Sequence, residues 1–177
     1  VPELMHLPPY LTAICQPEVL RPGRIGRITI TLDSRRLPNL GVNRASIYVA
    51  RFPGDKVRKA SEIDLSATLL PEFNLTDRQL QQAPMAVVPT SICLEGKVKK
   101  NTLKGSLVLE NRGAGVLHVS ALQVYNPGIS VSLSKSTLQP GEKATLKIKL
   151  LASSANFKGR RRILMITDDP TNSKITI

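Results

Sequence analysis

Two thirteen-residue segments of this 177-residue chain follow the same pattern, LRPGRIGRITITL at residues 20–32 and LQPGEKATLKIKL at residues 138–150. We call this pattern the repeated phrase. The match continues beyond the phrase, because Gly41 corresponds to Gly159 at the same spacing. A shared dipeptide would be chance, whereas a long phrase with a matching glycine further on is typical of an internal repeat. The chain is therefore expected to contain two copies of one structural unit.

Each copy of the phrase predicts a turn followed by a half-buried strand. Proline fixes φ near −65° and glycine adopts positive φ easily, so the Pro-Gly pair favours a type II turn. In the first copy Ile28, Ile30 and Leu32 alternate with polar residues, and in the second copy Leu146, Ile148 and Leu150 do the same. A period of two places the apolar residues on one face of a β-strand.

The rest of the chain contains further short segments of this type, separated by turn signals rich in Gly, Pro, Asn and Asp. They predict strands at Leu11–Gln16, Ser46–Phe52, Ser61–Leu70, Val87–Leu94, Gly105–Glu110, Val116–Tyr125, Ile129–Ser134, Arg161–Thr167 and Lys174–Ile177. Between the copies, Thr76 followed by Gln79 forms a capping box and predicts one short helix at about Asp77–Gln82. Many short strands with little helix predict an all-β fold of the sandwich type.

Composition limits the possible functions. Residues 73–177 carry 15 Lys and Arg against 6 Asp and Glu, so most of the net charge of +12 lies in the second half. Aromatic residues make up only 3% of the chain, which disfavours stacking on nucleic-acid bases. No apolar run reaches the length of a membrane helix, and no signal peptide is visible at the start of this sequence. Cys15 and Cys93 are too few for a disulfide framework or a zinc site, so we expect no metal or cofactor.

Basic residues are the strongest candidates for a binding surface. Lysines alternate along the second repeat strand, and the run KGRRR follows it. Grouped on one face, such residues could hold the phosphates or sulfates of an anionic polymer. The alternative is a solvated strand whose lysines prevent aggregation. The candidate anion-binding surface comprises Lys143, Lys147, Lys149, Lys158, Arg160, Arg161 and Arg162, and KVKK at residues 97–100 forms a further cluster.

Other polar residues favour structural roles. Asp168, Asp169 and Asn172 could supply oxygen ligands to calcium, but their spacing is not that of an EF-hand and suits a turn between strands. His118 alternates with apolar neighbours, and its position suggests no Asp or Cys partner. The sequence also contains no nucleophile elbow, phosphate-binding loop or paired carboxylates. We therefore expect no catalytic residues and no enzymatic activity.

Three segments of the second copy carry a family resemblance: GSLVLENRGAGVLHVSALQV, STLQPGEKATLKIKL and FKGRRRILMITDDP. Together they resemble a bacterial immunoglobulin-like family of unknown function, related to Hydin-type (ASH) and major-sperm-protein modules. Its members occur as tandem copies in envelope proteins of Bacteroides-like bacteria. The matching positions are Asn111, Gly113, Leu117, Val119, Leu138, Pro140, Gly141, Gly159, Thr167, Asp168, Asp169 and Pro170.

The resemblance implies a location in the periplasm, on the outer membrane surface or outside the cell. It also implies a non-catalytic structural, adhesive or protein-interaction module, with a protein or glycan as its partner. One alternative is a basic module that binds anionic polysaccharide or lipid headgroups, and another is an accessory domain of a larger enzyme or secretion component. Many members carry Cys-Gly-Cys in the loop where this chain reads VYNPGIS, so no thiol or metal role is carried over.

The repeat and the resemblance together predict tandem immunoglobulin-like sandwiches. Residues 1–72 would be the C-terminal part of a first module, residues 73–84 a linker with a short helix, and residues 85–177 a second module. Only nine residues precede YLTAICQ, so the opening strands of the first module are expected to be missing. Its apolar face would then be covered by strands outside this sequence, by a second copy of the chain in a homodimer, or by the second module.

Overall fold

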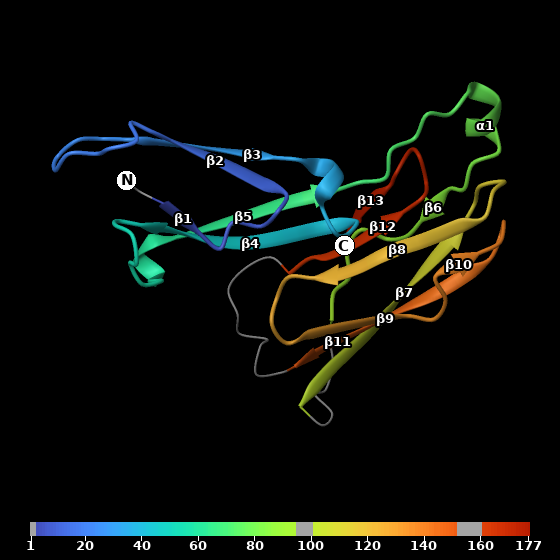
Figure 1. Cartoon of the computed structure of the whole chain (residues 1–177). Helices are drawn as coiled ribbons and strands as arrows, with labels where there is room; N and C mark the ends of the chain where they lie inside the picture. The colour runs from blue at the N-terminus through green and yellow to red at the C-terminus, as the bar shows by residue number, and fades with distance from the viewer. Residues whose placement is uncertain (1–2, 95–100, 152–160) are drawn as a thin grey trace. The chain divides into compact units, whose positions relative to one another are not determined.

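The computed structural model describes residues 3–94, 101–151 and 161–177, which form β-strands with very little helix (Figure 1). The all-β, immunoglobulin-like sandwich class predicted from the sequence is confirmed. The chain divides into two compact units, Val1–Leu69 and Leu70–Ile177, which we call the first and second unit. The predicted boundaries at residues 72 and 84 stay predictions.

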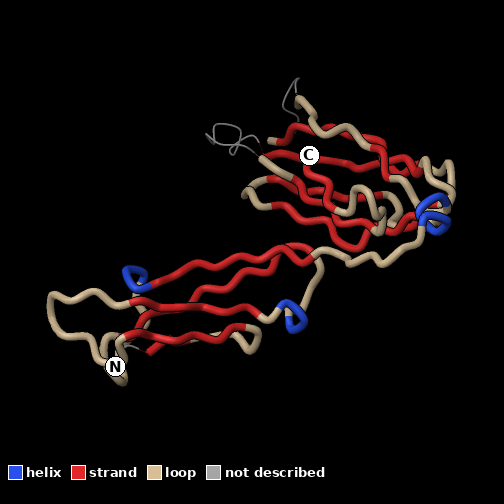
Figure 2. Tube along the Cα trace, turned by 90° about the horizontal axis from the view of Figure 1, so that it is seen from above, coloured by secondary structure: helices blue, strands red, loops and turns tan. Residues whose placement is uncertain are grey.

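The first element of the second unit is the helix α1 (Asp77–Gln81), which starts at the predicted capping box. The backbone N–H of Gln79 donates to Thr76 Oγ1. The strands that follow, drawn in red in Figure 2, form two antiparallel four-stranded sheets, ordered β10-β8-β12-β13 and β6-β7-β11-β9. The strands are β6 (Ala86–Val87), β7 (Thr102–Asn111), β8 (Leu117–Val124), β9 (Ile129–Leu133), β10 (Thr137–Leu138), β11 (Lys143–Leu151), β12 (Ile163–Thr167) and β13 (Lys174–Thr176).

The core of the second unit lies between these two sheets. Leu109, Leu146 and Met165 are fully buried there, together with Leu117 and Leu138. Along β11 buried residues alternate with exposed or half-buried ones, as the period of two in the repeated phrase predicts. The turn before that strand also has the predicted backbone, since Gly141 has φ of 78°.

Asn111 is a buried polar residue that holds the start of the second unit against its core. Its Oδ1 accepts hydrogen bonds from the backbone N–H groups of Met85 and Gly113, and its Nδ2 donates to the carbonyls of Gly115 and Leu138. A Cβ at Gly113 would overlap the backbone at Ala83 and Met85, so the close approach requires glycine. The Asn-x-Gly pattern is therefore structural here.

Asp169 is a second buried polar residue, at the turn between β12 and β13. Oδ1 accepts hydrogen bonds from Thr171 N, Thr171 Oγ1 and Asn172 N, and Oδ2 accepts one from Ala86 N at 2.9 Å. Four donors thus satisfy both carboxylate oxygens, which supports the turn interpretation of this segment over a calcium site. The bond to Ala86 also ties β6 to a residue far along the chain.

The first unit has two smaller sheets, ordered β1-β4-β5 and β2-β3 (Figure 1). Its core includes Ile47 and Leu11, and Gly23 in the β2–β3 loop has the positive φ expected of its turn. The elements are β1 (Glu3–Met5), β2 (Leu11–Gln16), β3 (Arg27–Leu32), β4 (Gly41–Ala50), β5 (Glu62–Leu69) and two single turns of 3₁₀-helix at Ser34–Arg36 and Lys59–Ser61.

The pairing order of the first unit matches part of the second unit strand by strand. β2 pairs with β3 as β9 pairs with β11, and β1-β4-β5 follow the order of β8-β12-β13. Within the described part of the first unit, nothing takes the place of β6, β7 or β10. The first unit therefore has the pairing pattern of an incomplete sandwich.

Two strand predictions need correction. The segment Val87–Leu94 was predicted as one strand, but only Ala86–Val87 pairs with β7, and Pro89 lies two residues after the end of this strand. Proline has no N–H to donate, so it interrupts a ladder of hydrogen bonds. The expectation that the opening strands of the first module are missing was also too broad, because Glu3–Met5 forms β1 and pairs with β4.

Acid should lower the free energy of unfolding of the first unit, because it protonates the Asp55 carboxylate in the loop before β5. Hydrogen bonds from Arg51 hold the pKa of Asp55 below its ordinary value, and Arg58 lies 2.7 Å from the same carboxylate. A carboxylate whose pKa is lower in the folded state stabilises the fold at pH values above its unfolded pKa of about 3.9. This stabilisation is lost as the pH falls through the folded-state pKa. Replacing Asp55 with Asn should remove this part of the pH dependence in acid unfolding experiments.

Candidate binding surfaces

The residues of the candidate anion-binding surface occupy different parts of the second unit. Lys143, Lys147 and Lys149 point outward from β11. Arg161 and Arg162 lie directly before β12. Lys158 and Arg160, together with the lysines of residues 97–100, lie outside the described residues.

The expectation that the strands at 143–150 and 161–167 are near neighbours is wrong, because β11 and β12 belong to opposite sheets of the sandwich. Inward residues of β11, such as Ile148, share a groove with Arg161 and Arg162, whereas Lys147 and Lys149 are on the outer face of the same strand. The predicted surface is therefore divided into an outward lysine group and an arginine pair.

The lysine group extends to a residue that the sequence analysis did not select. Lys149 of β11 lies opposite Lys104 of β7, and Lys147 lies opposite Ser106. On the other side of β11, Ser130 and Ser132 face these lysines from β9. We call the outward surface formed by Lys104, Lys147, Lys149, Ser106, Ser130 and Ser132 the lysine face.

Lys143 is separate from this face, because its Nζ lies 4.0 Å from Glu110 Oε1. Directly opposed like charges such as Lys104 and Lys149 destabilise a pair of strands. The opposed lysines therefore do not stabilise the sheet. Attraction of an anion to their two positive charges would explain why they lie opposite each other.

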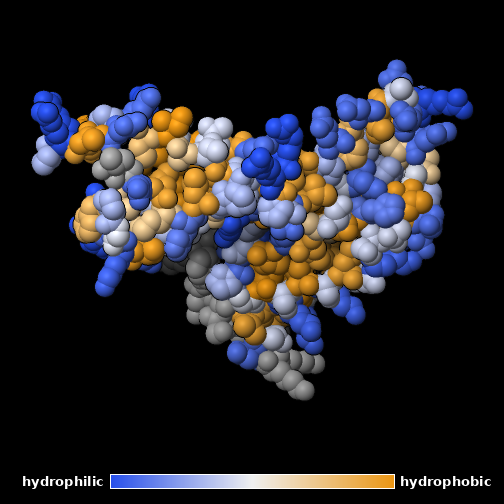
Figure 3. All heavy atoms as spheres, viewed as in Figure 1, coloured by the Kyte–Doolittle hydropathy of each residue, from blue (hydrophilic) through white to orange (hydrophobic). Residues whose placement is uncertain are grey.

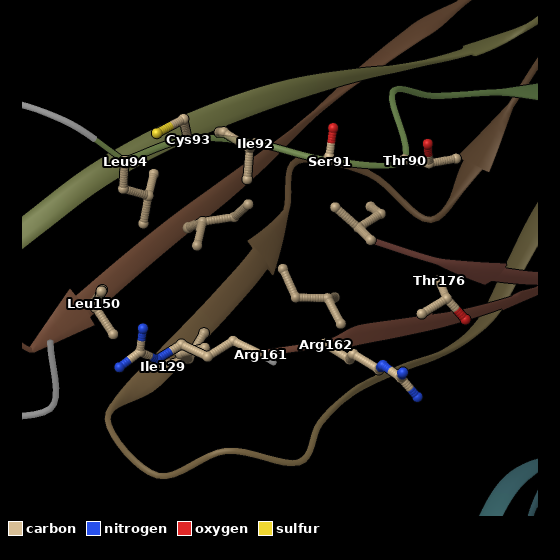
Figure 4. A pocket seen from close by; sticks show the side chains of 13 residues that line it. Thr90, Ser91, Ile92, Cys93, Leu94, Ile129, Leu150, Arg161, Arg162 and Thr176 are labelled. Carbon is tan, nitrogen blue, oxygen red and sulfur yellow. The ribbon is translucent and has the colours of Figure 1, made fainter. Parts of the chain in front are cut away.

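The arginine pair borders an open groove of about 640 Å³ at one end of the second unit (Figure 4). Its apolar lining comes from both sheets and from the segment after β6. Gly105 has no side chain, which leaves room for Ile92 and Leu94 to lie over β7. The residues that line the groove are Thr90, Ser91, Ile92, Cys93, Leu94, Ile129, Ile148, Leu150, Arg161, Arg162, Ile163, Thr176 and Ile177.

His118 has an acidic partner, contrary to the expectation from its position in the sequence. Its Nδ1 lies 2.7 Å from Asp168 Oδ2, and its backbone N–H donates to Asp168 Oδ1 at 2.7 Å. The backbone N–H of Asp168 in turn donates to the His118 carbonyl. These three bonds fix the turn after β12 to β8, which is a structural role.

Neither a metal cluster nor a spanning helix is found in the described ranges. No three His, Cys, Asp or Glu residues there are grouped so that they could hold a metal ion. None of the helices in those ranges has the length and apolar character needed to cross a membrane.

Apolar side chains reach the surface of the first unit (Figure 3). In the loop between β2 and β3, residues 17–26 are all exposed, and Ile25 is 95% exposed. Val19 and Leu20 are exposed in the same loop. We call Val19, Leu20 and Ile25 the apolar loop. Large exposed apolar patches mark interaction sites, and this loop carries three large exposed aliphatic side chains within seven residues.

Comparison with known proteins supports the fold and the family resemblance of the second unit. One solved structure is titled as a protein of unknown function from Porphyromonas gingivalis W83. Its alignment with this protein covers 99% of this chain and 82% of that chain, with 17% sequence identity and a TM-score of 0.67. No curated protein matches the sequence. Residues 95–177 match the sequence model of the HYDIN/CFA65/VesB-like, Ig-like domain. This part of the chain is therefore similar to the immunoglobulin-like domains of the HYDIN/CFA65/VesB-like family.

Proposed function

We propose that this chain is a non-catalytic interaction module of an envelope or secreted protein. The observation that carries the proposal is the apolar loop of the first unit, where Ile25 is almost completely exposed. Exposure of large aliphatic side chains to water is unfavourable, at roughly 25 cal/mol per Å² of apolar surface. Contact with a protein partner would remove that cost, and an Ig-like domain in the same chain is compatible with such a role.

Site-directed photo-crosslinking in intact cells tests this function. A photoreactive residue at Ile25 should give a discrete crosslinked protein, and the additional change Val19→Ser should reduce its yield several-fold. The same photoreactive residue at the exposed Lys59 is the matched control and should not give that product. Equal crosslinking from both positions, or none from Ile25, would contradict the proposal.

The lysine face supports a second candidate function, the binding of anionic polysaccharide or lipid headgroups. Lys104 and Lys149 are opposed despite their repulsion, and serine hydroxyls around them could donate to sulfate or phosphate oxygens. Affinity based on such contacts should fall as salt rises, because binding releases counterions.

Heparin chromatography tests the lysine face. Changing Lys104, Lys147 and Lys149 together to Gln should lower the salt concentration of elution and reduce the dependence of log affinity on log salt by about 2–3 units. A control with the same charge change at Lys56, Lys59 and Lys174 should shift elution much less. If both triple variants elute alike, the lysines are ordinary solvated surface residues.

A further inference from the structure

β3 of the first unit has one hydrogen-bonding edge with which none of the strands in the described ranges pairs. In the second unit the corresponding β11 lies between β7 and β9. In the first unit β3 pairs with β2 on one side, and no other strand in the described residues of that unit pairs with it. An open edge exposes a row of backbone donors and acceptors to which another strand can be added.

The hydrogen-bond pattern shows which amides of β3 point to this edge. Asp33 N donates to Tyr10 O at 2.9 Å, so residues 27, 29 and 31 are the ones that exchange hydrogen bonds with β2. The N–H groups of Ile28, Ile30 and Leu32 therefore point to the open edge.

The corresponding amides of β11 have partners. Asn111 N donates to Glu142 O and Ser134 N donates to Thr145 O, so the even-numbered residues of β11 bond to β7 and the odd-numbered residues to β9. Leu146, Ile148 and Leu150, which correspond to Ile28, Ile30 and Leu32, thus direct their amides to β7. This is the strand that has no counterpart in the first unit.

Side-chain burial differs between the two units in the same way. Leu146, Ile148 and Leu150 are 0%, 3% and 6% exposed. In the first unit Leu32 is 40% exposed, and Ile28 and Ile30 are only half-buried. The repeated phrase thus places equivalent apolar residues in a closed core in one unit and in an open core in the other.

A cavity of about 200 Å³ lies in the first unit beside this edge. Ile30 and Leu32 line it from β3, and Ala45 and Leu65 line it from β4 and β5, so it lies between the two sheets. An apolar cavity of this size has room for aliphatic side chains. A strand added to β3 would direct every second side chain toward it.

We propose that the open edge of β3 accepts one antiparallel strand, with apolar residues at alternate positions, from a polypeptide segment outside residues 1–177. This inference rests on the proposed interaction function and names the chemistry of the partner. The pairing of β7 with β11 specifies the pattern, since Leu107 lies opposite Leu146, Gly105 opposite Ile148 and Leu103 opposite Leu150. The added strand accordingly has apolar residues opposite Ile28 and Leu32, and a small or apolar residue opposite Ile30.

A second copy of the chain is a poorer source of this strand. β7 has the required pattern, but it already pairs with β6 on one edge and β11 on the other. Donating β7 would therefore require the second unit of the donor to unfold. Pairing of β3 with an edge strand of another copy, such as β3 itself, would appear as a dimer.

The test supplies a strand of known sequence to the full chain. The segment TLKGSLVLEN, residues 102–111, is fused before Val1 through a flexible Gly-Ser linker, which raises its effective concentration to the millimolar range. We expect exchange of the Ile28, Ile30 and Leu32 amides to slow at least about tenfold when all three become hydrogen-bonded. A control fusion in which the three leucines at the positions of Leu103, Leu107 and Leu109 are serine should give no such slowing.

Equal slowing by both fusions, or none with the leucine fusion, overturns the inference. A dimer of the unmodified chain in which these three amides are already protected overturns it in favour of a second copy. The result is independent of crosslinking at Ile25, since the strand test uses purified protein and the edge of β3. Failure of one experiment therefore leaves the other interpretable.

Discussion

Replacing Asp169 with Asn is expected to destabilise the second unit by about 2–4 kcal/mol. The carboxylate is 1% exposed, and four donors surround its two oxygens. An amide offers one oxygen and one NH₂ group, so either Ala86 N–H or the donors of Thr171 and Asn172 would face another donor. Leaving buried donors without acceptors costs about 1–3 kcal/mol each. Chemical denaturation followed by probes in the second unit measures the loss.

Asp168→Asn is the matched control. Its carboxylate is more exposed, its pairing with His118 lies at the surface, and an amide oxygen can still accept the His118 backbone N–H. Exposed pairs contribute roughly 0–1 kcal/mol, so we expect a small effect. Similar losses for the two variants would mean that burial of Asp169 does not hold β6 to the turn.

The second large effect is expected at Leu146. This side chain is fully buried in the core of the second unit, so Leu146→Ala should cost about 3–5 kcal/mol through lost apolar contact and the cavity that remains. Ile28→Ala is the matched change at the corresponding position of the first unit. Ile28 is only half-buried beside an open edge, and we expect a loss of about 1 kcal/mol from the smaller area removed from water.

Because the chain divides into two compact units, each variant is followed by probes in its own unit. Leu146→Ala should shift the unfolding of the second unit, and Ile28→Ala should shift that of the first unit only slightly. An equally large loss from Ile28→Ala would show that β3 is covered as completely as β11. That result would contradict the incomplete sandwich.

Much of the fold could be predicted because its strands are half-buried. Leu11, Ala13 and Cys15 share one face of the predicted strand Leu11–Gln16, which has the observed bounds. The Pro-Gly turns at Gly23 and Gly141 have the expected positive φ. The capping box at Thr76 likewise located the helix. These signals are local, since each depends on residues a few positions apart.

The candidate site depends on contacts between distant segments, which local patterns do not contain. The pairing of Lys104 with Lys149 follows from strand register, and His118 meets Asp168 only after β8 and β12 pair. Lys147 lies on β11 and Arg161 directly precedes β12, and these two strands belong to opposite sheets. An alternating pattern shows which residues share a face of a strand but not which strands are neighbours.

Amide exchange in the unmodified protein tests the central claim, that β3 has an open edge where β11 has a partner. We expect the amides of Ile28, Ile30 and Leu32 to exchange at least about a hundredfold faster than those of Leu146, Ile148 and Leu150. Within β3 itself, Thr29 and Thr31 should exchange more slowly than their neighbours, because their amides bond to β2. If all three amides at the edge of β3 were as strongly protected from exchange as their counterparts in β11, β3 would not have an open edge.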